Sequence, residues 1–193
     1  MDTQLLFLVL RPKSEVYKMA SELQRKIASH FNLYRQLPML HVTMLQMSGP
    51  VENKIIQKEI IDITSQVIAD APPVILITSD FKCLSISNRA LTLKLKKTPS
   101  LLVLSNKLKK ALKSISKIKL ITRPSEEEIF HITIASSLFS SNPWTEASYN
   151  EVCSLLERKK TGVKSKTRCL QLWRPQLKPQ EAIIHSFKLG ERE

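Results

Sequence analysis

Two copies of a His-x-Thr tripeptide, His41-Val42-Thr43 and His131-Ile132-Thr133, carry the chemistry that this sequence offers. Each copy lies among apolar residues in a pattern typical of a buried strand. Side chains on a strand alternate between its two faces, so each histidine shares a face with its threonine while the residue between them points the other way. Each motif therefore presents an imidazole beside a hydroxyl.

Two imidazoles can divide the roles that an in-line displacement at phosphorus requires. The reaction needs a base at the attacking oxygen and an acid at the leaving oxygen, on opposite sides of the phosphate. Because the unperturbed pKa of histidine is roughly 6.5, one imidazole can be neutral and the other protonated near neutral pH. The threonine hydroxyls would donate hydrogen bonds to the non-bridging oxygens. The predicted catalytic residues are His41, Thr43, His131 and Thr133.

Other interpretations of the histidines find less support. A single histidine is more often a structural imidazole bonded to the backbone, and we interpret His30 and His185, which lack a partner threonine, in this way. No carboxylate or cysteine lies at a ligand-like spacing around either motif, so no metal is expected. The three glycines form neither Gly-x-Gly-x-x-Gly nor a phosphate loop, so no ATP or dinucleotide cofactor is expected.

The apolar pattern predicts strands and helices whose order repeats once along the chain. The repeated order of strand, helix, motif strand and helix predicts a single domain, residues 1–193, of two pseudo-symmetric lobes that each supply one His-x-Thr motif. A hairpin is expected around the turn at 87–89, and 158–168 is expected to be a basic loop. The expected strands are 4–10, 39–45, 74–77, 82–87, 90–96, 129–135, 168–173 and 182–188, and the expected helices are 14–31, 51–69, 100–115 and 144–156.

Composition narrows the class of partner. Thirty Lys and Arg against seventeen Asp and Glu give a net charge of +13, which favours RNA or phosphorylated substrates, although lysines also serve solubility alone. The apolar run 5–10 is too short for a signal peptide or a membrane span. Three cysteines without a Cys-x-x-Cys argue against a disulfide framework and a zinc ribbon. We therefore expect a monomer in the cytoplasm that does not contact membranes.

The motifs and their flanking residues resemble the 2H phosphoesterase superfamily, which includes bacterial 2′-5′ RNA ligase-like proteins and cyclic phosphodiesterases. Residues 40–49 look like its first motif, and residues 130–135 are similar to the second, with Phe130 where relatives often have proline. The resemblance spans nearly the whole chain and is specific at the four motif residues. It implies an α+β fold in which two antiparallel sheets face each other across a central cleft, with helices on the outside and one motif on each side.

The resemblance also implies a reaction class. Relatives act without a metal on 2′,3′-cyclic phosphates, ADP-ribose cyclic phosphates or 2′-5′ linked oligonucleotides. The leading hypothesis is a phosphodiesterase that opens a 2′,3′-cyclic phosphate to a 2′-phosphate, with His131 as base and His41 as acid. Two alternatives stay open: a 2′-5′ phosphodiesterase or RNA 2′-5′ ligase that uses the same residues, and a non-catalytic nucleotide- or RNA-binding module.

Contacts to an RNA or nucleotide substrate require cations for phosphates and flat side chains for bases. The basic loop 158–168 is expected to contact the RNA backbone, whereas Lys107, Lys109, Lys110 and Lys113 fall on a helix and are expected to form a solvated face. The expected substrate-binding residues are Phe7, Tyr34, Arg35, Trp173 and Arg174.

Overall fold

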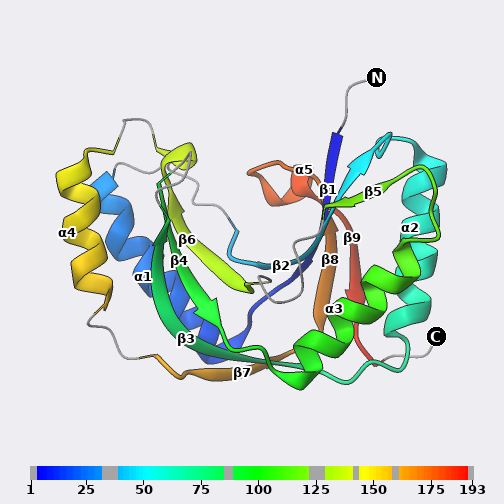
Figure 1. The fold of residues 1–193 in the computed structure, drawn as a ribbon, viewed down its shortest axis with the longest axis horizontal. Helices are drawn as coiled ribbons and strands as arrows, with labels where there is room; N and C mark the ends of the chain where they lie inside the picture. Colours follow the sequence, from blue (N-terminus) through cyan, green and yellow to red (C-terminus); the bar gives the residue numbers. More distant parts are fainter. Residues whose placement is uncertain are drawn as a thin grey trace.

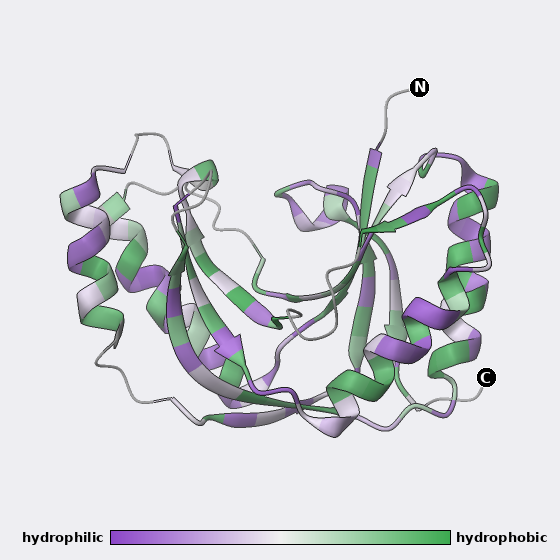
Figure 2. Cartoon of the chain, in the orientation of Figure 1, coloured by the Kyte–Doolittle hydropathy of each residue, from purple (hydrophilic) through white to green (hydrophobic). Residues whose placement is uncertain are grey.

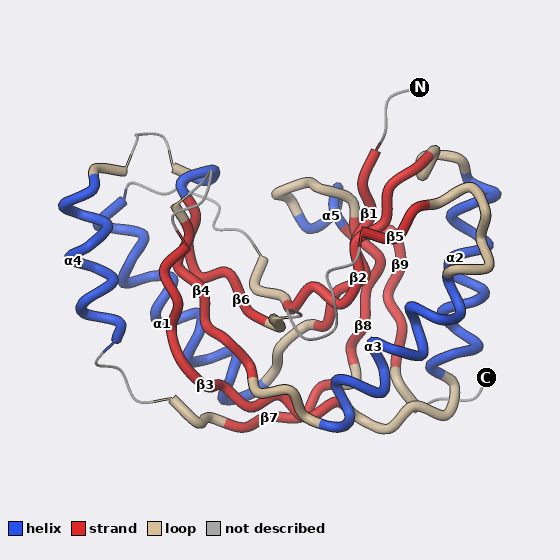
Figure 3. Tube along the Cα trace, in the orientation of Figure 1, coloured by secondary structure: helices blue, strands red, loops and turns tan. Residues whose placement is uncertain are grey.

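The computed structural model describes residues 4–31, 39–84, 89–121, 129–140, 144–157 and 161–190. These residues form an α+β fold in which helices flank antiparallel strands (Figures 1 and 3). The strands are β1 (Gln4–Leu10), β2 (Val42–Gly49), β3 (Val74–Leu84), β4 (Ala90–Leu95), β5 (Lys119–Ile121), β6 (His131–Ser136), β7 (Lys164–Thr167), β8 (Cys169–Trp173) and β9 (Ile183–Lys188). The helices are α1 (Ser14–Phe31), α2 (Lys54–Ile68), α3 (Pro99–Leu112), the 3-10 turn η1 (Ser137–Phe139), α4 (Glu146–Glu157) and α5 (Pro179–Ala182).

The strands form one antiparallel path, and its two halves meet at a single pair of residues in the described chain. The order is β7-β3-β4-β6-β2-β1-β8-β9, with β5 added on β2. Within the described ranges, β2 and β6 are joined only through the pair Val42 and Ile132. The halves on either side of this pair curve toward each other, with helices on their outer sides (Figure 1). The predicted α+β fold with two antiparallel sheets is confirmed, and the two sheets are joined at this junction.

Two helices, α1 and α3, pack against elements of the half that does not contain the strand before them. The helix α1 follows β1 but packs against β6 and β7, and the Gln24 side chain donates a hydrogen bond of 3.2 Å to the carbonyl of Ile134 in β6. The helix α3 follows β4 but packs against α2 beside the half that contains β2 (Figure 1). Each half is therefore held by a helix from the other part of the sequence, which ties the two motif strands into one structure.

Local sequence explains where the helices begin and which face they bury. The Asn53 side chain caps α2 by accepting a hydrogen bond of 2.9 Å from the backbone N–H of Ile55. Pro99 occupies the first turn of α3, where its missing N–H is not needed. The longer helices carry both polar and apolar residues, as expected for helices with one face in the core (Figure 2). The residues that α2 buries follow helical spacing: Ile56, Ile60, Thr64 and Ile68.

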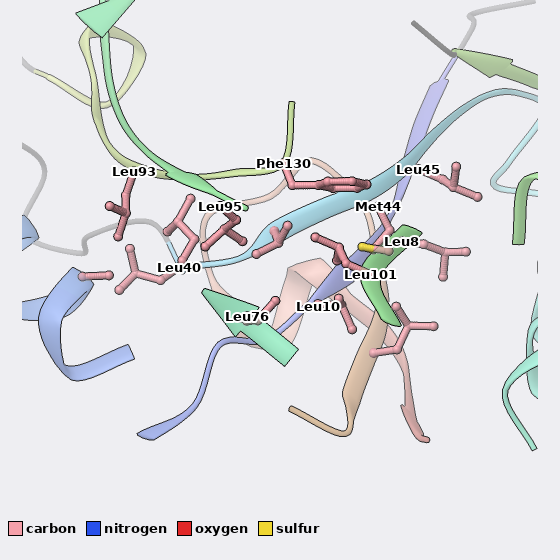
Figure 4. Packing of buried hydrophobic residues seen from close by; sticks show 14 of the residues in the cluster. Leu8, Leu10, Leu40, Met44, Leu45, Leu76, Leu93, Leu95, Leu101 and Phe130 are labelled. Atoms are coloured by element: carbon pink, nitrogen blue, oxygen red, sulfur yellow. The ribbon is translucent and has the colours of Figure 1, made fainter. Parts of the chain in front are cut away.

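The hydrophobic core runs through the junction between the two halves. Phe130, immediately before β6, is 1% exposed and lies among leucines from β1, β3 and β4 (Figure 4). Val42 and Ile132, the residues between the histidine and threonine of each motif, are both 0% exposed. Full burial of a side chain of this size contributes roughly 1.5–3 kcal/mol, so the core anchors both motifs from their apolar side.

Several expected elements differ from the structure, and the helices expected at 51–69 and 100–115 are shorter, Lys54–Ile68 and Pro99–Leu112. The first motif strand begins at Val42, not at residue 39, and continues to Gly49. The two short strands expected at 74–77 and 82–87 are one strand, β3, as far as Leu84, because the polar residues Ser79 and Asp80 form an irregularity in the pairing with β4 and do not end the strand. Residues 85–88, which include most of the turn expected at 87–89, lie outside the described residues. The basic segment expected to be a loop contains β7, which pairs with residues 74–77 of β3.

The expectation that the cysteines form no disulfide is wrong for one pair. Cys83 in β3 and Cys153 in α4 are bonded, with their Cα atoms 6.1 Å apart. The two residues are separated by 70 positions, so their proximity depends on how α4 docks and has no local signal. Disulfides are rare in reducing compartments such as the cytoplasm, so this bond does not support the predicted cytoplasmic location, which stays a prediction. Among the described residues, no helix combines the length and apolarity needed to cross a membrane.

Candidate active site

The two His-x-Thr motifs meet at the pair that joins the halves. Val42 and Ile132 are antiparallel partners, and extending this register by one residue in each direction puts His41 opposite Thr133 and Thr43 opposite His131. The motifs are thus related by a local two-fold arrangement, with all four polar side chains partly exposed. Diagonal neighbours across such a pair lie roughly 7–8 Å apart, which leaves room for one phosphate between two imidazoles.

Both histidines are oriented by the same backbone contact. The Nδ1 atom of His41 lies 2.8 Å from the carbonyl oxygen of Met39, and Nδ1 of His131 lies 3.2 Å from the carbonyl oxygen of Ile129. In each case the partner is two residues before the histidine. A carbonyl only accepts, so each Nδ1 carries the proton, and Nε2 is the ring nitrogen that can take or give a proton.

His41 lies in surroundings that disfavour its charged form. Burial lowers its pKa from the ordinary value of 6.5; the hydrogen bond to Met39 opposes this shift, and the positive charges of Arg11 and His131 add to it. The electrostatic effect of His131 agrees with the proximity that the strand register implies. At neutral pH the Nε2 atom of His41 is therefore predominantly unprotonated and suited to act as a base.

Two cations that sequence reasoning missed flank the histidines. Arg11 directly follows Leu10, which pairs with Val42, so the continued register puts Arg11 beside His41. Lys94 in β4 is the cross-strand partner of His131, and its ammonium lies 3.3 Å from a carboxylate oxygen of Asp80. The arrangement therefore brings one positive side chain to each histidine, where a phosphate would carry negative charge.

A pocket of about 400 Å³ opens beside His41, and we call it the site pocket. Its walls come from the His41 half and from η1, which follows β6 and contributes Leu138. Three of the five predicted substrate-binding residues line it: Phe7, Trp173 and Arg174. The other two, Tyr34 and Arg35, lie outside the described residues. The largely apolar lining next to an imidazole pair suits a nucleobase attached to a phosphate.

Trp173 packs against His41 and exposes little of its ring for stacking on a ligand. It is 5% exposed, and its ring centroid lies 4.8 Å from that of His41. Its indole N–H donates a hydrogen bond of 3.0 Å to the side-chain oxygen of Gln171, and the guanidinium of Arg11 lies over its ring at 5.4 Å. Phe7 remains partly exposed in the same pocket and is the better-placed aromatic for a base.

The remaining histidines are not among the described residues that line the site pocket. His185 is in β9, with its ring centroid 4.5 Å from that of Phe187, and it does not line the site pocket. His30 is in α1, and its side chain is outside the described residues. No group of three or more His, Cys, Asp or Glu side chains suited to a metal ion occurs in the part of the chain that the structure describes.

Comparisons with known proteins identify the fold. No protein-family model and no curated protein matches the sequence. Among solved structures, TT0787 of Thermus thermophilus is 16% identical with a TM-score of 0.62, and the match covers 98% of this chain and 100% of that chain. LigT of E. coli, complexed with phosphate, is 15% identical with a TM-score of 0.56 and coverage of 99% and 100%. Usb1 of Kluyveromyces marxianus is 14% identical with a TM-score of 0.50 and coverage of 97% and 98%.

These structures are members of the 2H phosphoesterase superfamily. The chain therefore has the 2H phosphoesterase fold, and the resemblance predicted from its two motifs is confirmed at this level. At 14–16% identity the likeness establishes the fold alone, so the reaction has to be argued from the site.

Proposed function

We propose that this protein is a metal-independent phosphodiesterase that opens 2′,3′-cyclic phosphates of RNA or nucleotides to 2′-phosphates. The observation that carries the proposal is the pairing of the motifs around Val42 and Ile132, with both Nδ1 atoms bonded to backbone carbonyls. In the proposed complex the two Nε2 atoms and the two threonine hydroxyls would contact one phosphate. Solved structures of LigT in complex with phosphate and with 3′-AMP are consistent with a nucleotide at such a site.

In the proposed reaction, one imidazole activates water and the other protonates the departing oxygen. The lowered pKa of His41 favours His41 as the base, which reverses the order expected from the sequence. The Nε2 atom of His41 takes a proton from water as the water oxygen attacks phosphorus. The bond from phosphorus to the 3′ oxygen breaks, and protonated His131 gives its Nε2 proton to that oxygen, leaving a 2′-phosphate and a free 3′ hydroxyl.

The threonines and the two cations would stabilise the negative charge on the phosphate. Thr43 and Thr133 would donate hydrogen bonds to the non-bridging oxygens, and Arg11 and Lys94 would add positive charge on the two sides. The partly apolar site pocket would take the base beside the phosphate. The division of the chain into two pseudo-symmetric lobes that each contribute half of this site belongs to the same proposal, as does action as a monomer.

A product screen tests the proposed reaction. The protein is incubated with adenosine 2′,3′-cyclic phosphate, adenosine 3′,5′-cyclic phosphate and a 2′-5′ linked adenosine dinucleotide, and products are separated by chromatography. We expect adenosine 2′-phosphate from the first substrate. Formation of the 3′-phosphate, or cleavage of the 2′-5′ linkage alone, would contradict the proposal. A mock preparation from cells that do not express the protein, purified in the same way, serves as the control for contaminating activity.

The same screen separates the alternatives. Tight binding of a nucleotide without any product supports a non-catalytic binding module. Joining of an RNA end that carries a 2′,3′-cyclic phosphate to a 5′ hydroxyl end supports a 2′-5′ ligase, because ligation is the reverse of the corresponding cleavage and uses the same residues.

The pH dependence of kcat/KM follows from the assignment of the base. Because His41 must be neutral in order to accept a proton, activity falls as the pH falls through its pKa, and the midpoint of the acid limb lies below 6.5. Replacing Arg11 by Gln removes one of the charges that lower this pKa, so the midpoint moves upward. The measurement is a pH–rate profile of both proteins with a cyclic mononucleotide. A midpoint that is above 6.5 in the parent, or unmoved in Arg11→Gln, argues that His41 is not the base.

A further inference from the structure

Three pockets follow one another from His41 along the turn between β1 and α1. The site pocket contains His41 and Met39. A second pocket of about 740 Å³, which we call the turn pocket, shares Met39 with it and is lined by Arg11. A third, of about 540 Å³, shares Lys13 and Cys169 with the turn pocket, and we call it the basic pocket. The shared residues show that neighbouring pockets in this series are adjacent to each other.

The turn pocket has the size and lining of a nucleoside site. Arg11 lines this pocket, and its positive charge also acts on His41. Tyr17 is 43% exposed and its ring offers a flat surface for a base, and the nearly buried amides of Gln24 and Gln171 complete the wall with polar groups. Pockets for small ligands are typically about 300–1,000 Å³ and combine apolar walls with a few polar groups, as here.

The basic pocket is lined by positively charged side chains. Four cations line it and no acidic side chain does: Lys13, Lys166, Arg168 and Lys188. The guanidinium of Arg168 is held by a hydrogen bond of 3.0 Å to the carbonyl of Leu189. Lys166 lies on the exposed face of β7, and Lys13 lies in the turn after β1. Cations from three parts of the chain therefore converge on one hollow, which favours a polyanion over a single small anion.

We propose that the protein binds single-stranded RNA along these three pockets. The phosphate to be opened lies between His41 and His131, the neighbouring nucleotide occupies the turn pocket, and phosphates further along the strand contact the basic pocket. The alternation of a phosphate position, a nucleoside-sized hollow and a second phosphate position matches the repeat of a nucleic acid strand. Separate hollows suit unpaired nucleosides and not the paired bases of a duplex. This inference depends on the proposed function for the position of the reacting phosphate, and it names the substrate class as an oligonucleotide.

The test measures how RNA affinity depends on strand length, in two variants that each lose the same number of positive charges. The ligands are a 2′-O-methylated octanucleotide and a dinucleotide, both with fluorescent labels and resistant to cleavage, and affinity is measured by anisotropy across a series of salt concentrations. We expect the octanucleotide to bind at least about tenfold more tightly than the dinucleotide, because only the longer strand reaches the basic pocket. The variant Lys166→Ala/Lys188→Ala changes two residues that line the basic pocket and not the turn pocket. It should lose about tenfold in octanucleotide affinity while its dinucleotide affinity changes less than about twofold.

The salt series gives a second readout. Each phosphate contact on a single strand contributes about 0.7 to the slope of log affinity against log salt, so the loss of two contacts should reduce the slope by about 1.4. The matched control is Lys107→Ala/Lys110→Ala on the exposed face of α3, which removes the same charge and should weaken octanucleotide binding by less than about threefold. Equal losses in the two variants, or equal affinity for the two ligands, would overturn the proposal. Length-dependent binding without turnover would instead overturn only the proposed reaction.

Discussion

Alanine at either His41 or His131 lowers kcat for the opening of a 2′,3′-cyclic phosphate by at least about 100-fold. General acid–base catalysis typically contributes 10²–10⁴-fold, so the loss corresponds to roughly 2.7 kcal/mol or more of transition-state stabilisation. The fold should survive, because both histidines are partly exposed while the neighbouring Val42 and Ile132 provide the buried contacts. Initial rates give kcat and KM, and circular dichroism with thermal melting checks the fold.

The matched control for this prediction is His185→Ala. His185 is a partly exposed strand histidine that contacts Phe187 and does not line the site pocket, so its loss should leave kcat unchanged. A second check is His41→Gln, which keeps a side chain that can contact Trp173 and Met39 but cannot serve as the base. If the protein with alanine at both motif histidines still opens the cyclic phosphate at the parent rate, the acid–base role is excluded.

The orientation of the motif side chains could be predicted from the sequence because it depends only on local geometry. Alternation along a strand predicts that Val42 and Ile132 point away from their histidine and threonine neighbours. In the structure both residues are 0% exposed, and the polar members of each motif are partly exposed. The sequence also predicts helix α1 with its observed bounds, Ser14–Phe31, since its apolar residues follow one continuous stripe.

The neighbours of the histidines could not be predicted in the same way. Alternation in the expected strand 90–96 assigns Lys94 to the face opposite Leu93 and Leu95, but it does not reveal that β4 pairs with β6. The same holds for Arg11, which reaches His41 only because β1 and β2 are adjacent and antiparallel. Strand order is a long-range property, set by how the whole core packs, and no local pattern encodes it.

The strand β7 shows a different limit. Its sequence, Lys-Ser-Lys-Thr, contains no apolar residue and has the composition of a charged loop. In the structure Ser165 and Thr167 are buried while Lys164 and Lys166 are exposed, so the strand alternates small polar residues inside with lysines outside. It lies at the end of the sheet order, where exposed lysines discourage pairing with other chains. A pattern search for apolar alternation therefore misses it.

The second large effect is a difference between two substrates in the activity lost by His131→Ala. One of the two substrates has a leaving group that does not need to be protonated by an acid. The ester of a nucleoside phosphate with 4-nitrophenol releases an anion that is stable at neutral pH, so protonation of the leaving oxygen contributes little. With the cyclic phosphate, the leaving oxygen belongs to ribose and must be protonated. If His131 is the acid, His131→Ala should lose at least about 100-fold on the cyclic phosphate and less than about tenfold on the nitrophenyl ester.

His41→Ala should behave differently, because a base is needed for both substrates. It should lose at least about 100-fold on each, so the ratio of the two losses distinguishes the base from the acid. The lowered pKa of His41 is the reason for this direction, since a neutral imidazole accepts a proton and cannot donate one from Nε2. If instead His41→Ala regains activity on the nitrophenyl ester and His131→Ala does not, His41 is the acid and His131 is the base. Equal losses on both substrates in both variants would mean that neither histidine protonates the leaving oxygen, and the remaining role of the pair would be to hold the phosphate.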